Sequence, residues 1–215
     1  MLLLFLLVTG SASAQGLDGL FLQMRFAFGN FQENHYFFGP EGQYLMDVPE
    51  GGLTSDDVAR ACAKRPKQCG TYKLLGPNLV LTPREGQPET MTIERSPDGN
   101  LKLDGRFTKK VDKFAAGAKL SGIYSRIDNA GGAISAAQSY TFNPDGTFTS
   151  SSLGAVTTSQ GTGQSKSSAS GTYRLSGNTL ELTANGAVRR IVAYPYDVGK
   201  GDVRLNLDGV FFRKQ

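Results

Sequence analysis

The sequence predicts an all-β protein built from two tandem antiparallel meander β-barrels, with one short helix in the first copy. The first observation behind this prediction is an internal repeat: residues 70–74, GTYKL, return as residues 171–175, GTYRL, and residues 103–107, LDGRF, return as residues 207–211, LDGVF. The second is a period of two in the apolar residues of each copy, which is typical of half-buried antiparallel strands. The third is turn chemistry, because Asp-Gly and Gly-Asn steps supply the positive φ of tight hairpins.

Residues 1–14 are predicted to be a signal peptide. The apolar run 2–8 leads to Ala12-Ser13-Ala14, the small-x-small pattern that a signal peptidase cuts, so we expect the mature chain to begin at Gln15. The run is too short to span a bilayer, and we expect no transmembrane segment later in the chain. These features predict a protein that is exported to the periplasm or out of the cell.

The mature chain is expected to divide at a short polar segment. Residues 15–107 are predicted to form the first barrel, residues 108–119 a linker, and residues 120–215 the second barrel. Each copy should contain about six to eight short strands, which is the usual number for a small barrel.

The two copies differ most between their aromatic strand and their Gly-Thr-Tyr strand. In copy one, residues 46–69 carry Thr54 as a helix N-cap and the first-turn acids Asp56 and Asp57, which predicts a short helix. In copy two, residues 149–170 are mostly Ser, Thr and Gly, which predicts a flexible loop. Because specificity usually resides in loops that differ over a shared scaffold, both segments are candidate binding regions.

The only two cysteines, Cys62 and Cys69, lie seven positions apart. In an exported protein this spacing predicts a disulfide that closes a short loop. A metal site would need further soft or imidazole ligands, and the only histidine, His35, belongs to another strand. We therefore expect a structural staple, no metal and no cofactor.

The net charge of +4 is modest, and its basic side chains are scattered along the sequence. A nucleic-acid surface needs a dense basic stripe with interleaved aromatic residues, so no nucleic-acid partner is expected. The most site-like surface feature is the basic cluster of Lys64, Arg65 and Lys67 inside the cystine loop. These three residues are candidate binding residues, and the alternative is a solvated charged loop.

Two further candidates lie on the aromatic strand of copy one. His35 has no nucleophile or carboxylate beside it in a recognisable catalytic pattern, so it is interpreted as a surface or barrel-mouth residue or as a binding residue. Phe37 and Phe38 are adjacent, so one of them should face outward and line the contact between the copies or a ligand surface. Asp104 and Asp208 each precede a glycine and are interpreted as hairpin residues. The sequence contains no familiar catalytic signature, and we predict a protein that is not an enzyme and has no catalytic residues.

The turn and strand motifs resemble those of a known group of domains. The patterns are Phe-x-Pro-Asp-Gly-x-Phe at residues 142–148, Gly-Thr-Tyr at residues 171–173 and Gly-Asn-x-Leu-x-Leu at residues 177–182, with a looser match in copy one. They resemble the lipocalin-like and broader calycin-like barrels of exported bacterial proteins, over nearly all of the mature chain. The resemblance implies lipocalin-like barrels, although residues 19–21 and 122–124 replace the Gly-x-Trp of true lipocalins.

Two binding functions are favoured by these features, with a divergent hydrolase or a purely structural role in the cell envelope as weaker alternatives. One is an exported binding module whose barrels hold a small apolar ligand, with residues 46–69 and 149–170 at the barrel mouths. The other is a protein-binding or inhibitor module that contacts another exported protein through the cystine loop, residues 62–69. The oligomeric state stays open at this point.

Overall fold

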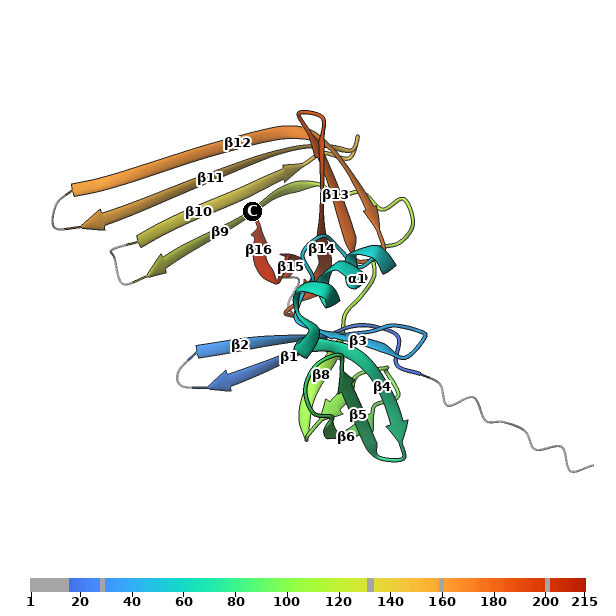
Figure 1. Ribbon diagram of the computed structural model, residues 1–215. Coiled ribbons are helices and arrows are strands. Elements are labelled where there is room, and N and C mark those ends of the chain that lie inside the picture. Colours follow the sequence, from blue (N-terminus) through green and yellow to red (C-terminus); the bar gives the residue numbers. More distant parts are fainter. Residues whose placement is uncertain (1–15, 28–29, 131–133, 159–160, 200–201) are drawn as a thin grey trace, which may run out of the picture.

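The computed structural model describes residues 16–27, 30–130, 134–158, 161–199 and 202–215, and it shows two closed antiparallel β-barrels in tandem (Figure 1). Each barrel has eight strands in simple meander order, which confirms the predicted fold class and duplication. The predicted signal peptide, residues 1–14, lies outside the described residues. None of the helices in the described ranges has the length and apolar character needed to span a membrane.

The first barrel contains eight strands and one helical insertion. The strands are β1 (Gly19–Ala27), β2 (Asn30–Phe38), β3 (Gln43–Met46), β4 (Cys69–Leu75), β5 (Asn78–Pro83), β6 (Glu89–Arg95), β7 (Leu101–Leu103) and β8 (Arg106–Lys110). Between β3 and β4 the chain forms helix α1 (Ser55–Lys64) and the short 3-10 helix η1 (Pro66–Gln68). Since β8 ends at Lys110, the first three residues of the segment 108–119 belong to the first barrel.

The second barrel follows the same strand order, and its described residues form no helix. Its strands are β9 (Gly122–Ala130), β10 (Ile134–Phe142), β11 (Thr147–Thr158), β12 (Gly161–Ser176), β13 (Thr179–Ala184), β14 (Ala187–Asp197), β15 (Val203–Leu207) and β16 (Val210–Lys214). The connecting segment is fixed to this barrel, because Phe114 forms an isolated β-bridge with Gly177 and the Asn178 amide donates to the carbonyl oxygen of Asp112 at 2.8 Å.

Large side chains fill the interior of each barrel. The buried cluster of the first barrel includes Phe21, Tyr36, Phe38, Tyr44, Tyr72, Leu79, Leu81, Met91, Ile93, Leu101 and Leu103. The buried cluster of the second includes Tyr124, Tyr140, Phe142, Phe148, Tyr173, Leu175, Leu180, Leu182, Ile191, Leu205, Leu207 and Phe212. Rings at repeated positions meet edge to face, with centroid distances of 5.1 Å for Phe38 and Tyr72 and 5.0 Å for Phe142 and Tyr173. Both barrels are therefore packed cores rather than hollow containers.

The repeated Gly-Thr-Tyr motif has a structural role in both copies. The Tyr72 hydroxyl donates to the carbonyl oxygen of Leu17 at 2.6 Å, and the Tyr173 hydroxyl donates to that of Leu120 at 2.9 Å. Each tyrosine thus fixes the chain just before the first strand of its barrel. Asp104 and Asp208 are turn residues with φ of 49° and 52°, as expected for the positive φ of their hairpins.

Helix α1 and the disulfide both form as predicted. Thr54 and Asp57 make a reciprocal capping box at the start of the helix, and Cys62 is bonded to Cys69. The apolar face of the helix covers the outer surface of the first barrel, where Val58, Ala61 and both half-cystines pack against Leu45.

The segment 149–170 differs from its prediction. Instead of a flexible loop it forms most of a long hairpin, in which β11 and β12 pair without interruption from Thr147 opposite Thr172 to Thr158 opposite Gly161. With β9 and β10 it makes a four-stranded sheet that extends beyond the barrel, and we call this extension (residues 126–130, 134–139, 149–158 and 161–170) the wing (Figure 1). The loop prediction was wrong because the exposed strand lacks apolar alternation: residues 163–168 all face solvent.

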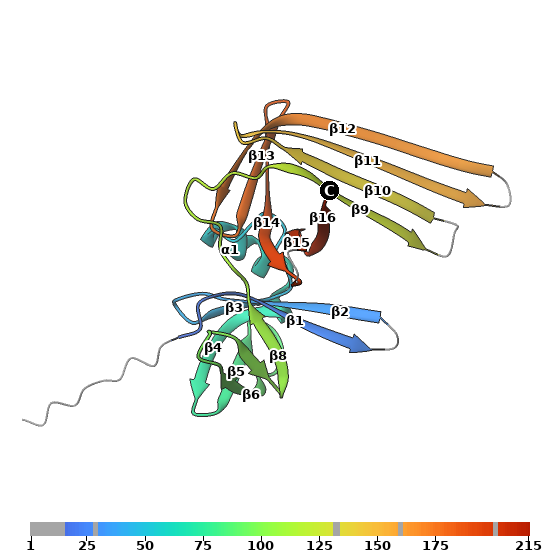
Figure 2. The same cartoon turned by 180° about the vertical axis from the view of Figure 1, so that it is seen from behind.

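The two barrels meet along a buried seam, which we define by Leu20, Leu22, Val111, Val192 and Tyr194. Leu20 and Leu22 lie on the outer face of β1, and Val192 and Tyr194 lie on the outer face of β14. All four are at most 1 % exposed. The hairpin β1–β2 and the wing project to the same side of the molecule, as the two opposite views show (Figure 1, Figure 2).

Candidate functional site at the junction of the barrels

The segment that precedes α1 connects the first barrel to the second. The backbone N–H of Leu53 donates to the Thr179 hydroxyl at 3.0 Å. Gly51 and Gly52 have φ of 102° and 98°, and a Cβ on Gly52 would lie 2.6 Å from the Thr179 side chain. Glycine is required here for both backbone conformation and close approach. The insertion that distinguishes copy one, residues 46–69, therefore packs on copy two, and we call this insertion, which includes α1, the adaptor.

An open groove of about 860 Å³ lies beside this adaptor. One wall comes from the adaptor, including α1, and the other comes from β14 and the turn before β16. We call it the basic groove; it is lined by Glu50, Gly51, Arg60, Ala61, Lys64, Arg65, Val188, Arg189, Arg190 and Asp208. Five of these side chains are basic and two are acidic, so the lining carries a positive excess. Anionic groups are the ligands that such a lining favours.

Carboxylates pair with four of the five basic side chains, including Arg60 with the buried Asp57 and Arg190 with Glu181. Lys64 Nζ lies 2.8 Å from Glu50 Oε2, and Arg189 Nη2 lies 3.1 Å from Asp208 Oδ2. Lys64, Glu50 and Arg189 have more than half of their side-chain surface exposed, so water screens these pairs. A ligand carboxylate can therefore replace the protein's own at little cost.

The acidic groups of the groove differ in their environment. Lys64 lowers the pKa of Glu50 through its hydrogen bond and charge. Burial raises the pKa of Asp208, although the hydrogen bond from the Val192 N–H and the nearby Arg189 oppose this effect. Asp208 is thus more easily neutralised than an ordinary aspartate, which would release the Arg189 guanidinium for another anion.

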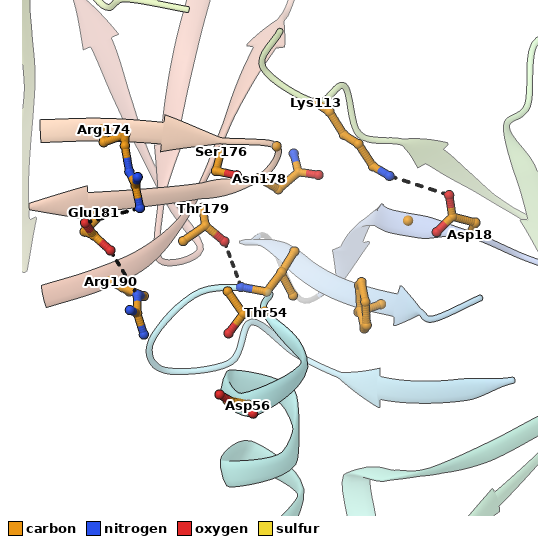
Figure 3. A pocket seen from close by; sticks show the side chains of 14 residues that line it. Asp18, Thr54, Asp56, Lys113, Arg174, Ser176, Asn178, Thr179, Glu181 and Arg190 are labelled. Atoms are coloured by element: carbon orange, nitrogen blue, oxygen red, sulfur yellow. Dashed lines mark hydrogen bonds and ion pairs between the residues drawn. The ribbon is translucent and has the colours of Figure 1, made fainter. Parts of the chain in front are cut away.

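A second hollow of about 490 Å³ borders the same junction, and Arg190 lines both (Figure 3). Here the charges balance, with Asp18, Asp56 and Glu181 against Lys113, Arg174 and Arg190. Glu181 binds both arginines, with Oε2 3.1 Å from Arg190 Nε and Oε1 3.7 Å from Arg174 Nη2. The lining of this hollow has equal numbers of acidic and basic side chains, whereas the lining of the basic groove has an excess of basic ones, so the basic groove is the stronger candidate for an anionic ligand.

The five candidate binding residues fall into different places. Lys64 and Arg65 line the basic groove, and the Arg65 guanidinium donates to the carbonyl oxygen of Val48 at 3.1 Å. Lys67 lies on η1, exposed and outside the groove lining. Phe37 packs against both the seam and the α1 cluster, and its role in ligand binding stays a prediction.

His35 lies in the seam and not on the surface. It is 4 % exposed, and its Nε2 lies 2.7 Å from the Tyr194 hydroxyl. Because burial disfavours the imidazolium form, the pKa of His35 is lowered to about 4. The interpretation of His35 as a surface residue was therefore wrong.

Three basic residues of the groove were not predicted as site residues: Arg60, Arg189 and Arg190. In the sequence they belong to a scattered positive charge, and only the packing of the barrels brings the residues of α1 and β14 together. The adjacent Arg189 and Arg190 on one strand were the signal available beforehand.

The described residues contain no group of three or more His, Cys, Asp and Glu side chains that could hold a metal ion. No protein-family model, curated protein or solved structure matches this chain. The tandem eight-stranded barrels are thus a structural finding, whereas kinship with lipocalin-like proteins stays a prediction from the motifs.

Proposed function

We propose that this protein is an exported, non-enzymatic binding module that holds an acidic segment of a partner protein in the basic groove. The observation that carries this proposal is the convergence of five basic side chains from both copies on one open groove. The two barrels serve as a rigid frame, and the adaptor with its cystine loop supplies one wall. The proposal keeps Lys64 and Arg65 of the predicted protein-binding surface and adds the β14 wall.

The alternative function, binding of a small apolar ligand inside a barrel, has less support. It requires free space among the inward-facing side chains, as in barrels that hold one small ligand. The aromatic rings of both interiors instead contact one another at centroid distances of 5.0 to 6.4 Å. A ligand would have to displace these contacts.

An acidic chain segment fits the groove better than a single small anion. The cations lie on two opposing walls, and each wall also carries an acid, Glu50 or Asp208. A small anion can replace one internal pair only, whereas an extended segment with several carboxylates can engage both walls. Long-range attraction by the positive excess would also speed its association.

The test uses the full mature chain and an octaglutamate peptide as the probe. Replacing one exposed cation on each wall, in the double variant Lys64→Glu and Arg189→Glu, should weaken binding about tenfold or more at low salt, because two attractive contacts become repulsive. Titration calorimetry or fluorescence anisotropy measures the affinity. The loss should shrink as salt rises from about 50 to about 300 mM, because the Debye length shortens over this range.

The matched control is Lys67→Glu with Lys73→Glu, which changes the net charge equally at exposed positions outside the groove. Its affinity for the peptide should stay within about threefold of the wild-type value, because only screened long-range attraction is lost. Equal losses in both double variants would mean that the peptide senses net charge alone, and the groove would no longer be a specific site.

A further inference from the structure

Among the residues that the structure describes, the outer half of β12 has a neighbouring strand on one side only. On one side β12 pairs with β11 from Gly161 onward, but on the other it pairs with β13 only from Thr172. Across the described residues no strand pairs with the free side between Gly161 and Gly171. Residues 163–168 are exposed, and a Cβ placed on Gly163 would meet nothing within 4 Å. The backbone N–H and C=O groups of this edge are available for pairing.

This edge lacks the usual protection against pairing. Its register with β11 runs without a bulge, and residues 161–171 contain no proline. Its only charged side chain is that of Lys166. Natural edge strands are normally blunted by several charges, prolines or bulges, so a long regular edge of this kind is suited to an intermolecular sheet.

We propose that β12 pairs with β12 of a second copy of this chain, so that two wings join into one continuous sheet around a twofold axis. A second copy is favoured over a foreign peptide as the pairing partner because of the side chains along this edge. They are small, mostly Ser, Gly and Ala, and offer no pockets of the kind by which strand-adding domains select a foreign peptide. A second copy needs no such pockets, because it presents the same small side chains and pairs symmetrically.

The other free edge of the wing is a poorer partner. The C-terminal strand β16 and Gln215 cover β9 from Ile123 to Ser125, with the Gln215 N–H donating to the Ile123 carbonyl oxygen at 2.9 Å. Only residues 126–130 remain, and they carry the Arg126–Asp128 ion pair. A β12–β9 contact would also be heterologous and would generate a ring or an open filament, whereas a β12–β12 contact closes as a dimer.

Charge excludes one register of the proposed pair, the one with Lys166 on the axis, and the proposed dimer takes the neighbouring register with Ser167 on the axis. In a twofold antiparallel pair, residues opposite each other must lie on the same face of the sheet. With Ser167 on the axis, Lys166 lies opposite Ser168 and no like charges meet. Moving the axis to Lys166 would place the two lysines directly opposite each other, which is destabilising.

The test follows from this register and does not depend on the basic groove. The self-association of the full mature chain is measured by sedimentation equilibrium from micromolar to submillimolar concentrations. We expect a monomer–dimer equilibrium for the wild type. Ser168→Glu places a new carboxylate opposite Lys166 of the other copy, twice across the axis, and should tighten the dimer roughly 2- to 30-fold, less so at high salt. Ser168→Lys places like charges opposite each other and should leave a monomer.

Two further variants make the assignment specific. Ser151 lies directly opposite Ser168 on the neighbouring strand β11, so Ser151→Lys adds the same charge one strand away from the edge and should leave the dimer unchanged. The double variant Lys166→Glu with Ser168→Glu restores like charges and should be monomeric again. A monomeric wild type, an open polymer, or equal effects of Ser151→Lys and Ser168→Lys would each overturn the proposal.

Discussion

His35 is an imidazole held in its neutral form by the packing of two domains. Its hydrogen-bond partner Tyr194 comes from the other barrel, and burial raises the pKa of that tyrosine while it lowers the pKa of His35 to about 4. The nearby Asn206 is fully buried, and its carboxamide oxygen accepts from the Gly209 N–H at 2.9 Å. Burial among these groups therefore favours the neutral form of His35.

This arrangement predicts a loss of stability in acid. As the pH falls below 6.5, the unfolded chain takes up a proton at His35 before the folded chain does, so the free energy of unfolding decreases until the pH reaches about 4. The lowering of the pKa corresponds to roughly 3 kcal/mol. Urea unfolding between about pH 7.5 and about pH 4 should show this decrease in the wild type and not in His35→Gln, which keeps a neutral hydrogen-bonding side chain.

The His35→Gln variant also distinguishes the effect of His35 on the free energy of unfolding from the effects of the carboxyl groups. Burial raises the pKa of both Glu33 and Asp208, so their protonation in the folded state opposes the loss of stability as the pH falls. Both carboxyl groups are present in the wild type and in the variant. The difference between the two profiles of unfolding free energy against pH therefore gives the contribution of His35. Parallel profiles would show that the seam tolerates the imidazolium.

At the scale of single elements, the close approach of two paired strands explains why the glycine of the Gly-Thr-Tyr motif is repeated. A Cβ on Gly70 would lie 1.9 Å from the Thr82 carbonyl oxygen, and one on Gly171 would lie 1.8 Å from that of Thr183. Both glycines let the backbone of the fifth strand lie where a Cβ on the fourth strand would stand. The need is for space, because neither residue has a positive φ.

Replacing either glycine should therefore separate these strands. Gly171→Ala is expected to lower the free energy of unfolding by about 3 kcal/mol, since the carbonyl that it meets belongs to backbone and cannot move alone. Gly163→Ala is the matched control, because it lies on the same strand and its Cβ meets nothing within 4 Å. Equal stabilities of the two variants in urea unfolding would contradict this account of the motif.

The sequence predicted elements wherever one face of a strand or helix is buried. The alternation around Tyr72 and Tyr173 indicated the barrel strands, and the capping residues Thr54 and Asp57 indicated α1. The wing was not predicted because both of its faces are exposed to solvent. Its strands are therefore rich in Ser, Thr and Gly and lack the alternation of apolar residues by which a strand is recognised. Strand pairing there depends on the ladder with β11, which local sequence does not reveal.

The candidate site was predictable only in part, for a related reason. Lys64 and Arg65 were found because they adjoin the cystine, whereas Arg60 and Arg189 come together through the seam between two copies. Such a contact depends on which outer faces of the barrels are apolar, and Leu22 on β1 looks in the sequence like any other strand residue. Local motifs therefore predicted part of the groove and tertiary packing supplied the rest.

At the scale of the whole molecule, the duplication produces two similar barrels, and the segments that they do not share make the two barrels different. Among the described residues, only copy one has the adaptor and only copy two has the full wing. The groove needs residues from both copies, so its geometry depends on the seam. Apolar burial along the seam, from Leu22 to Val192, should couple the two barrels into one cooperative unit.

The last prediction tests this coupling. Val192 is fully buried in the seam but points away from the interior of its own barrel, so Val192→Asp should part the barrels without emptying either core. Scanning calorimetry should then resolve two unfolding transitions in place of one, and binding of octaglutamate should weaken together with the coupling. Val188→Asp lies on the same outward face of β14 at a position that is 57 % exposed, and it should keep the single transition. Leu22→Asp places a charge in the seam from the side of the first barrel and should also give two transitions. A single transition in both seam variants would show that the barrels unfold as one unit for reasons other than this contact.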